Sequence, residues 1–217
     1  MKKRAAVLMG CVISTLVIAG VYFVAIHGES PKEILSSEME VDVSTLPIDR
    51  IRASYVIDVG NKNEVAGLAD YVFAGRVISN NKTIYEDVIE METEEGGTRL
   101  VGSPYTEYTI EVVDNIKGKL KKNKPITMLK DGGVSMDLDA VFLYEADELP
   151  EPGRYYIFIG FAQSDGALLI SGPGSNLLLT AKNKQEIVSS DEYKAYKKAV
   201  QNEVKFDRER YKATEQE

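Results

Sequence analysis

The chain is almost without the residues that hold metals or activate catalytic nucleophiles. Among its 217 residues there is one cysteine, Cys11, one histidine, His27, and no tryptophan. A structural zinc site needs about four cysteine or histidine ligands, and a catalytic serine is usually activated by a histidine. Disulfides and Cys/His zinc sites are therefore excluded beyond residue 27, and we expect no enzymatic activity, no catalytic residues, no metal and no cofactor. A Ser–Lys dyad stays open, although no pattern points to one.

Charge is absent from residues 5–26, which follow the basic residues Lys2, Lys3 and Arg4. A helix needs roughly 20 apolar residues to cross the hydrocarbon core of a bilayer. The sequence therefore predicts a cytoplasmic basic stub at 1–4 and a transmembrane signal anchor at 5–27. Because basic flanks stay in the cytoplasm, we expect a single-pass protein of the cell membrane whose C-terminal domain is extracytoplasmic. Cleavage as a secretory signal peptide and lipidation at Cys11 remain open alternatives.

Basic residues are few beside the acidic ones. The portion after the stub contains 23 lysines and arginines against 34 aspartates and glutamates, a net charge of −11. Phosphate-rich polymers and anionic lipid headgroups repel such a surface. We therefore expect no nucleic-acid partner. The partners predicted are the membrane, through residues 5–27, and an envelope protein or a cell-wall polymer.

Residues 28–60 are polar, contain Pro31 and Pro47 and show no sustained period, which predicts a tether. Apolar residues at helical spacing predict a helix over 61–70, with Asn61 or Asn63 as N-cap. A second helix is predicted at 186–217. Its signature is a capping box from Ser189 to Glu192, and its apolar stripe comprises Tyr193, Tyr196, Val200 and Val204.

Short segments rich in β-forming residues fill the region between these helices. They are 71–78, 105–113, 126–129, 141–144, 155–161, 167–170 and 177–180. The first is predicted to end at the turn Ser79-Asn80-Asn81, and Gly75 in its middle predicts a bulge. The pattern predicts a mainly β fold with flanking helices: an OB-like small β-barrel at 61–185, plus the N-terminal transmembrane helix and a C-terminal amphipathic helix. A two-layer β-sandwich is the alternative.

The middle of the chain carries a recurrent order of core and turn residues. Residues 69–77 read A-D-Y-V-F-A-G-R-V, residues 108–118 form a strand ending in K-G, and D-G-G at 131–133 precedes E-P-G-R-Y-Y at 151–156. This order resembles the netrin-like domain of tissue inhibitors of metalloproteinases and a group of uncharacterised bacterial cell-surface proteins, over roughly residues 64–180. The resemblance implies an OB-type barrel with a flanking helix. It does not imply inhibition, because the N-terminal cysteine with which that family chelates zinc has no counterpart here.

Tyrosines offer the most plausible ligand surface. OB domains stack ligands on aromatic side chains, and we single out Tyr108, Tyr155 and Tyr156 as ligand-binding candidates. Two acidic clusters, at 86–95 and 137–151, lack the spacing of a calcium loop. The function predicted is a non-enzymatic, membrane-anchored binding or interaction module. The alternatives are an inhibitor or regulator of an extracytoplasmic protease and an envelope hydrolase that uses paired carboxylates.

Overall fold

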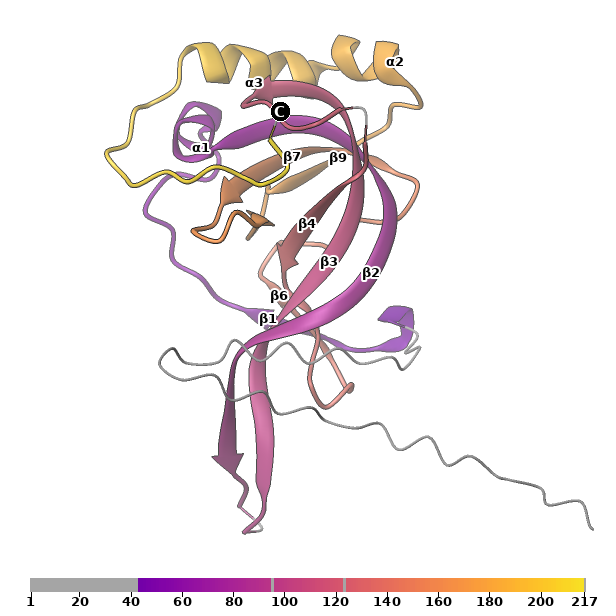
Figure 1. Ribbon diagram of the computed structural model, residues 1–217, viewed down its shortest axis with the longest axis vertical. Helices are drawn as coiled ribbons and strands as arrows, with labels where there is room; N and C mark the ends of the chain where they lie inside the picture. Colours follow the sequence, from indigo (N-terminus) through magenta and orange to yellow (C-terminus); the bar gives the residue numbers. More distant parts are fainter. Residues whose placement is uncertain (1–42, 95, 123, 217) are drawn as a thin grey trace, which may run out of the picture. The chain divides into compact units, whose positions relative to one another are not determined.

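A computed structural model describes residues 43–94, 96–122 and 124–216 (Figure 1). The predicted signal anchor, and with it the possible lipidation site Cys11, lies outside these residues, as does the first part of the predicted tether. Among the helices that the structure describes, none has the length and apolar character needed to cross a membrane.

Five strands close into a barrel. They are β2 (Tyr71–Glu92), β3 (Thr98–Lys117), β4 (Ile126–Asp131), β8 (Leu168–Ile170) and β7 (Tyr155–Ala162), paired in that order. The circle closes where β7 pairs with β2, from Tyr71 opposite Gly160 to Arg76 opposite Tyr155. All neighbours are antiparallel except β4 and β8. The fold is therefore mainly β with an OB-like barrel, which confirms the prediction of a barrel over a sandwich.

Every second side chain along a strand points into the barrel and fills its core. In β3 the side chains of Tyr108, Ile110 and Val112 are buried, whereas the residues between them are half-buried or exposed. The predicted bulge at Gly75 is confirmed, because the β2–β3 register shifts between Ala74 and Gly75. A side chain at Gly75 would lie 2.9 Å from Ile110, so the crowded core requires glycine there.

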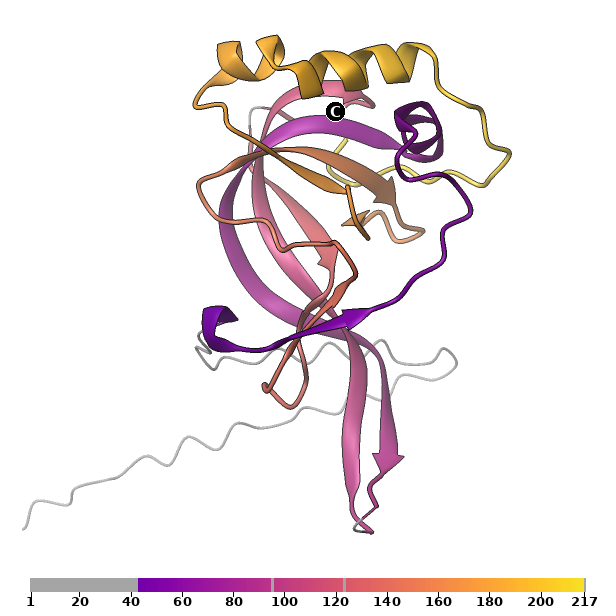
Figure 2. The same ribbon diagram turned by 180° about the vertical axis from the view of Figure 1, so that it is seen from behind.

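Further elements lie around the barrel (Figures 1 and 2). A small sheet joins β1 (Ile48–Ile51), β6 (Val141–Tyr144) and β5 (Gly133–Val134), with β1 and β6 parallel. Strand β9 (Asn176–Leu179) pairs with β7. Helices α2 (Lys184–Ser189) and α3 (Asp191–Gln201) bury Ile187, Tyr193 and Tyr196 against a second apolar cluster that includes Ile157 and Ile159. Helix α1 (Lys62–Leu68) precedes β2, and a 3₁₀ turn (Val43–Thr45) precedes β1.

Several predicted boundaries differ from the structure. Strand β2 continues through the predicted turn Ser79-Asn80-Asn81, because a register shift between Asn80 and Lys82 absorbs the extra residue. Asn81 then bonds across the ladder to Glu107 and Thr109. The predicted tether at 28–60 contains β1, which pairs with β6 in the domain.

The C-terminal helix is shorter than predicted and has a different cap. Helix α3 ends at Gln201, and its N-cap is Ser190, whose side chain accepts from the Tyr193 amide. Ser189 instead ends α2. Residues 203–216, called here the C-terminal segment, contain no helix and run back along the barrel (Figure 1).

Candidate functional site

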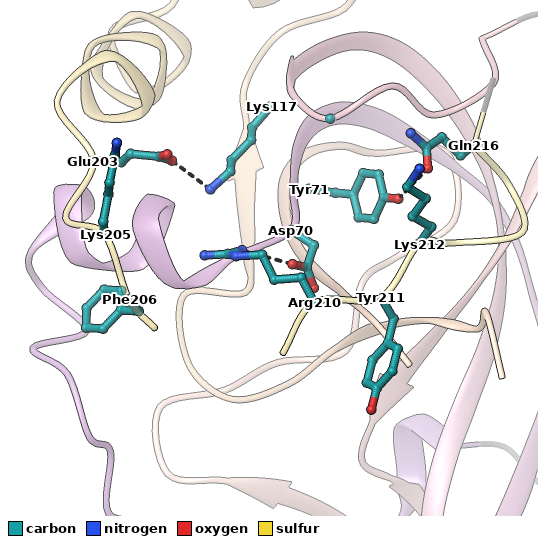
Figure 3. Close-up of a pocket in the computed structure, with 11 residues that line it drawn as sticks. Asp70, Tyr71, Lys117, Glu203, Lys205, Phe206, Arg210, Tyr211, Lys212 and Gln216 are labelled. Carbon is teal, nitrogen blue, oxygen red and sulfur yellow. Dashed lines mark hydrogen bonds and ion pairs between the residues drawn. The ribbon is translucent and has the colours of Figure 1, made fainter. Parts of the chain in front are cut away.

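The C-terminal segment forms one wall of a pocket of about 420 Å³ (Figure 3). The opposite wall is the junction of α1 and β2, together with the end of β3. The residues that line it are Asp70, Tyr71, Lys117, Gly118, Glu203, Lys205, Phe206, Arg210, Tyr211, Lys212 and Gln216. This volume lies within the range of about 300–1,000 Å³ that is usual for small-ligand sites.

Asp70 anchors the C-terminal segment to the barrel. Its Oδ1 accepts from Arg208 at 2.6 Å and from Arg210 at 2.9 Å, and its Oδ2 accepts from the backbone amide of Ala162 at 3.1 Å. The carboxylate is almost fully buried, whereas the two guanidinium groups are partly exposed. Such charge-assisted bonds are stronger than neutral ones, so the wall of the pocket is held in a defined position.

The same arginines cap helix α1. Arg208 donates to the carbonyl oxygen of Leu68, and Arg210 donates to those of Gly67 and Ala69. These carbonyls have no partner within the helix, and cations are favoured at a helix C-terminus. Gly67 also lets the chain cross closely, because a β-carbon there would lie 1.8 Å from the carbonyl oxygen of Val204.

Lysine side chains set the charge of the pocket. Lys117 donates to Glu203 at 2.6 Å and to the carbonyl oxygen of Ala66 at 2.7 Å. Lys205 and Lys212 are exposed and have no ion-pair partner among the described residues. Four cationic side chains and two carboxylates line the site, which leaves two positive charges in excess. The pocket is therefore locally basic on a chain whose net charge is −8.

The predicted ligand-binding tyrosines do not converge on this pocket. Tyr108 is fully buried and Tyr156 is 5% exposed, so both belong to the barrel core. Burial raises the pKa of both hydroxyls. Tyr155 is half-buried beside the guanidinium of Arg76, at 5.9 Å from ring centre to carbon, and lines a different pocket with Arg154 and Leu179.

A second polar cluster is buried between β4 and the loops that follow β6 and β8. Lys130 Nζ donates to Asp147 at 2.5 Å and to the hydroxyl of Ser175 at 3.1 Å. Burial lowers the pKa of Lys130 and raises that of Asp147, and each charge opposes the shift of the other. Ser175 in turn donates to the carbonyl oxygen of Gly172.

This cluster has the residue types of a Ser–Lys dyad but not the arrangement of a working one. A general base accepts a proton from its serine, whereas Lys130 is the donor to Ser175 and is paired with a carboxylate. All three side chains are buried, so the cluster joins the elements that surround it and presents no nucleophile at the surface. Sequence reasoning missed it because residues 130, 147 and 175 are widely separated along the chain.

The acidic segments do not form a metal centre in the part of the chain that the structure describes. No group of three or more His, Cys, Asp or Glu side chains lies close enough there to hold an ion. Asp137 pairs with Arg99, and Asp139 accepts from the hydroxyl of Ser135.

Comparison with known proteins does not assign the chain to a family. A scan against protein-family models finds no match, and a search of curated proteins finds none either. The class defined by the fold and the site is an OB-like barrel whose C-terminal segment completes a basic pocket.

Proposed function

We propose that the chain is a non-enzymatic binding module that holds an anionic group of its ligand in the basic pocket. One observation supports this most directly: Lys205 and Lys212 flank the pocket without an acidic partner in the described chain. A ligand phosphate or carboxylate would supply the missing counter-charge, and lysine ammonium groups are suited to such anions.

The remainder of the lining supports a ligand with an apolar part beside the charge. Phe206 and Tyr211 contribute aromatic rings on the same segment as the two lysines (Figure 3). Pockets that combine apolar walls with a few placed polar groups are typical of ligand sites. The bonds from Arg208 and Arg210 to Asp70 hold this wall before a ligand arrives, which lowers the entropy lost on binding.

The proposal includes the location predicted from the sequence. The basic stub and the apolar segment 5–27 favour an anchor in the cell membrane with the barrel outside the cytoplasm. The ligand is then an anionic group on an envelope protein or on a cell-wall polymer. No netrin-like inhibitory role is part of the proposal.

The test is a calorimetric titration, at low salt, of the full chain in detergent micelles with inorganic pyrophosphate and, separately, with citrate. We expect saturable binding that weakens as ionic strength rises. The variant Lys205→Gln/Lys212→Gln is expected to bind at least about tenfold more weakly, a loss of about 1.4 kcal/mol.

The control variant is Lys197→Gln/Lys198→Gln on helix α3. It removes the same charge from exposed positions that do not line the pocket. Equal weakening in both variants would show a general charge effect. That result, or the absence of saturable binding to either anion, would contradict the proposed site.

A further inference from the structure

The hairpin of β2 and β3 extends far beyond the barrel as a two-stranded arm (Figures 1 and 2). We define the arm as residues 86–103. Its strands pair from Glu86 opposite Ser103 to Glu92 opposite Thr98. In the described chain neither strand of the arm pairs with a third strand, so both of its edges are open. The arm lies at the end of the barrel opposite α2 and α3 (Figure 1).

Large apolar side chains of the arm are exposed. Ile89 is 58% exposed, Met91 41% and Leu100 42%. Because directly opposed residues of an antiparallel pair share a face, Ile89 and Met91 lie on one face of the ribbon, whereas Leu100 lies on the other. An isolated two-stranded ribbon is marginally stable in water. These side chains gain burial only if another surface covers them.

Charge on the arm is almost entirely of one sign. The sequence from 86 to 103 contains six acidic residues and one basic residue, Arg99. Glu90 and Glu92 are exposed and share a face of the ribbon with Leu100, which lies directly opposite Glu90, whereas Arg99 lies on the other face, opposite Met91. A surface that covers the face of Leu100 therefore has an apolar centre and basic residues around it.

The arm is contacted near its base by the loop between β5 and β6. A bulge between Glu86 and Ile89, where Asp87 has φ +53°, sets the direction of the arm. Gly102 lies close to Val88 and Met136, and Arg99 donates to Asp137 at 3.3 Å. These contacts restrict the orientations of the arm, which favours binding because less conformational entropy is lost when a partner docks.

We propose that the arm is a docking surface for a partner protein that presents an apolar patch bordered by lysine and arginine. A second copy of this chain is disfavoured, because its net charge of −8 repels the acidic arm. Anionic lipid is repelled for the same reason. The partner is therefore a different protein of basic surface charge. This site is separate from the basic pocket and does not depend on a ligand there.

The experiment places a photoreactive phenylalanine analogue in the full chain, expressed in the cells from which it comes. Leu100 is the test position, because it shares a face with Glu90 and Glu92. The control position is Leu178, the same residue type in β9, 47% exposed and outside the arm. We expect a protein adduct from position 100 and none from position 178. Peptide mapping is expected to place the cross-link beside lysines and arginines of the partner.

Charge reversal then tests the complementarity. The variant Glu90→Lys/Glu92→Lys is expected to reduce the yield of adduct at least fivefold, and to weaken binding of the purified partner at least tenfold. The control variant Asp191→Lys/Glu192→Lys makes the same charge change at exposed positions of α3 and is expected to leave both unchanged. An adduct with a second copy, equal adducts from both positions, insensitivity to the reversal or no adduct at all would each overturn the proposal.

Discussion

The ammonium group of Lys130 lies 2.5 Å from Oδ2 of Asp147, and the two side chains are 0% and 2% exposed. This pair connects β4 to the loop that follows β6. Arg50 donates to the carbonyl oxygens of Tyr144 and Asp147, so the same loop is also held from β1. The small sheet is thereby linked to the barrel through one buried charge pair and one arginine.

Removal of one partner from this pair is expected to be costly. The substitution Lys130→Met leaves the Asp147 carboxylate buried without a counter-ion, which lowers the free energy of unfolding by about 3–5 kcal/mol. Equilibrium unfolding in urea measures the change. The exposed control Lys205→Met is expected to stay within about 0.5 kcal/mol. The double variant Lys130→Met/Asp147→Leu is expected to regain most of the loss, and failure to do so would contradict a role for the unpaired charge.

The hydroxyl groups of two core tyrosines are expected to contribute differently to the free energy of unfolding. The Tyr108 hydroxyl is buried without a hydrogen-bond partner among the described residues, whereas the Tyr156 hydroxyl accepts from the Glu151 amide at 2.9 Å. We expect Tyr108→Phe to leave the free energy of unfolding unchanged or higher, and Tyr156→Phe to lower it by about 1 kcal/mol. Thermal and urea unfolding of both variants give the comparison. Equal losses would show that the Tyr108 hydroxyl is also bonded.

A side chain at Gly118 is expected to clash with a neighbouring residue. Gly153, which has a similar positive φ but no close neighbour, serves as the comparison. Gly118 has φ +77° and Gly153 has φ +83°, so alanine is strained by roughly 1–2 kcal/mol at either position. A β-carbon at Gly118 would also lie 2.3 Å from Cδ1 of Tyr71, whereas one at Gly153 meets nothing within 4 Å.

We therefore expect Gly118→Ala to lower the free energy of unfolding by about 1–3 kcal/mol more than Gly153→Ala. Because Tyr71 and Gly118 both line the basic pocket, anion binding is expected to weaken in the first variant alone. Equal destabilisation by the two alanines, measured by urea unfolding, would argue against the contact with Tyr71.

Stability is expected to fall at alkaline pH. Burial raises the pKa of Tyr193 and of Tyr196 to about 12, and the bond from Tyr193 to Asp114 adds to the shift of the former. In the unfolded chain a tyrosine loses its proton near pH 10. Between about pH 10 and 12 the folded state thus binds more protons, so the free energy of unfolding decreases as pH rises.

The slope of this decrease is at most about 1.4 kcal/mol per pH unit for each tyrosine. Urea unfolding at intervals from pH 9 to 12 measures it. In Tyr193→Phe one contribution is removed, and the slope is expected to be shallower over the same window. An unchanged slope would mean that Tyr193 ionises alike in the folded and unfolded chain.

The sequence was a good guide wherever a local pattern decided the structure. Alternation at Tyr108, Ile110 and Val112 predicts the inward face of β3. Of the two predicted caps of α1, Asn61 or Asn63, the structure has Asn61, whose side chain accepts from the Asn63 amide. These features depend on neighbours along the chain. The number of such strands and their apolar faces predict a small barrel, closed or partly open, and the pairing of β7 with β2 shows that it is closed.

Local sequence patterns do not predict which distant residues pair in the folded chain. Polar residues at 79–81 resemble a turn, yet their ladder partners Glu107 and Thr109 keep β2 extended. The charged sequence after Gln201 is predicted as part of the helix at 186–217. Its arginines instead find Asp70 and the end of α1, about 140 residues earlier. The pocket therefore depends on contacts between residues far apart in the sequence, which local sequence patterns do not predict.

The continuity of β2 has a mechanical consequence. One curved strand runs from Tyr71, which lines the pocket, to Glu92 in the arm, a contour length of about 70 Å at 3.3 Å per residue. Because β2 and β3 form one hairpin, a pull on the arm draws both strands together, and the bonds of β2 with β7 and of β3 with β4 resist it in shear. A load on the arm would thus reach the barrel at these two seams, while the long β2–β3 ladder would carry it without sliding.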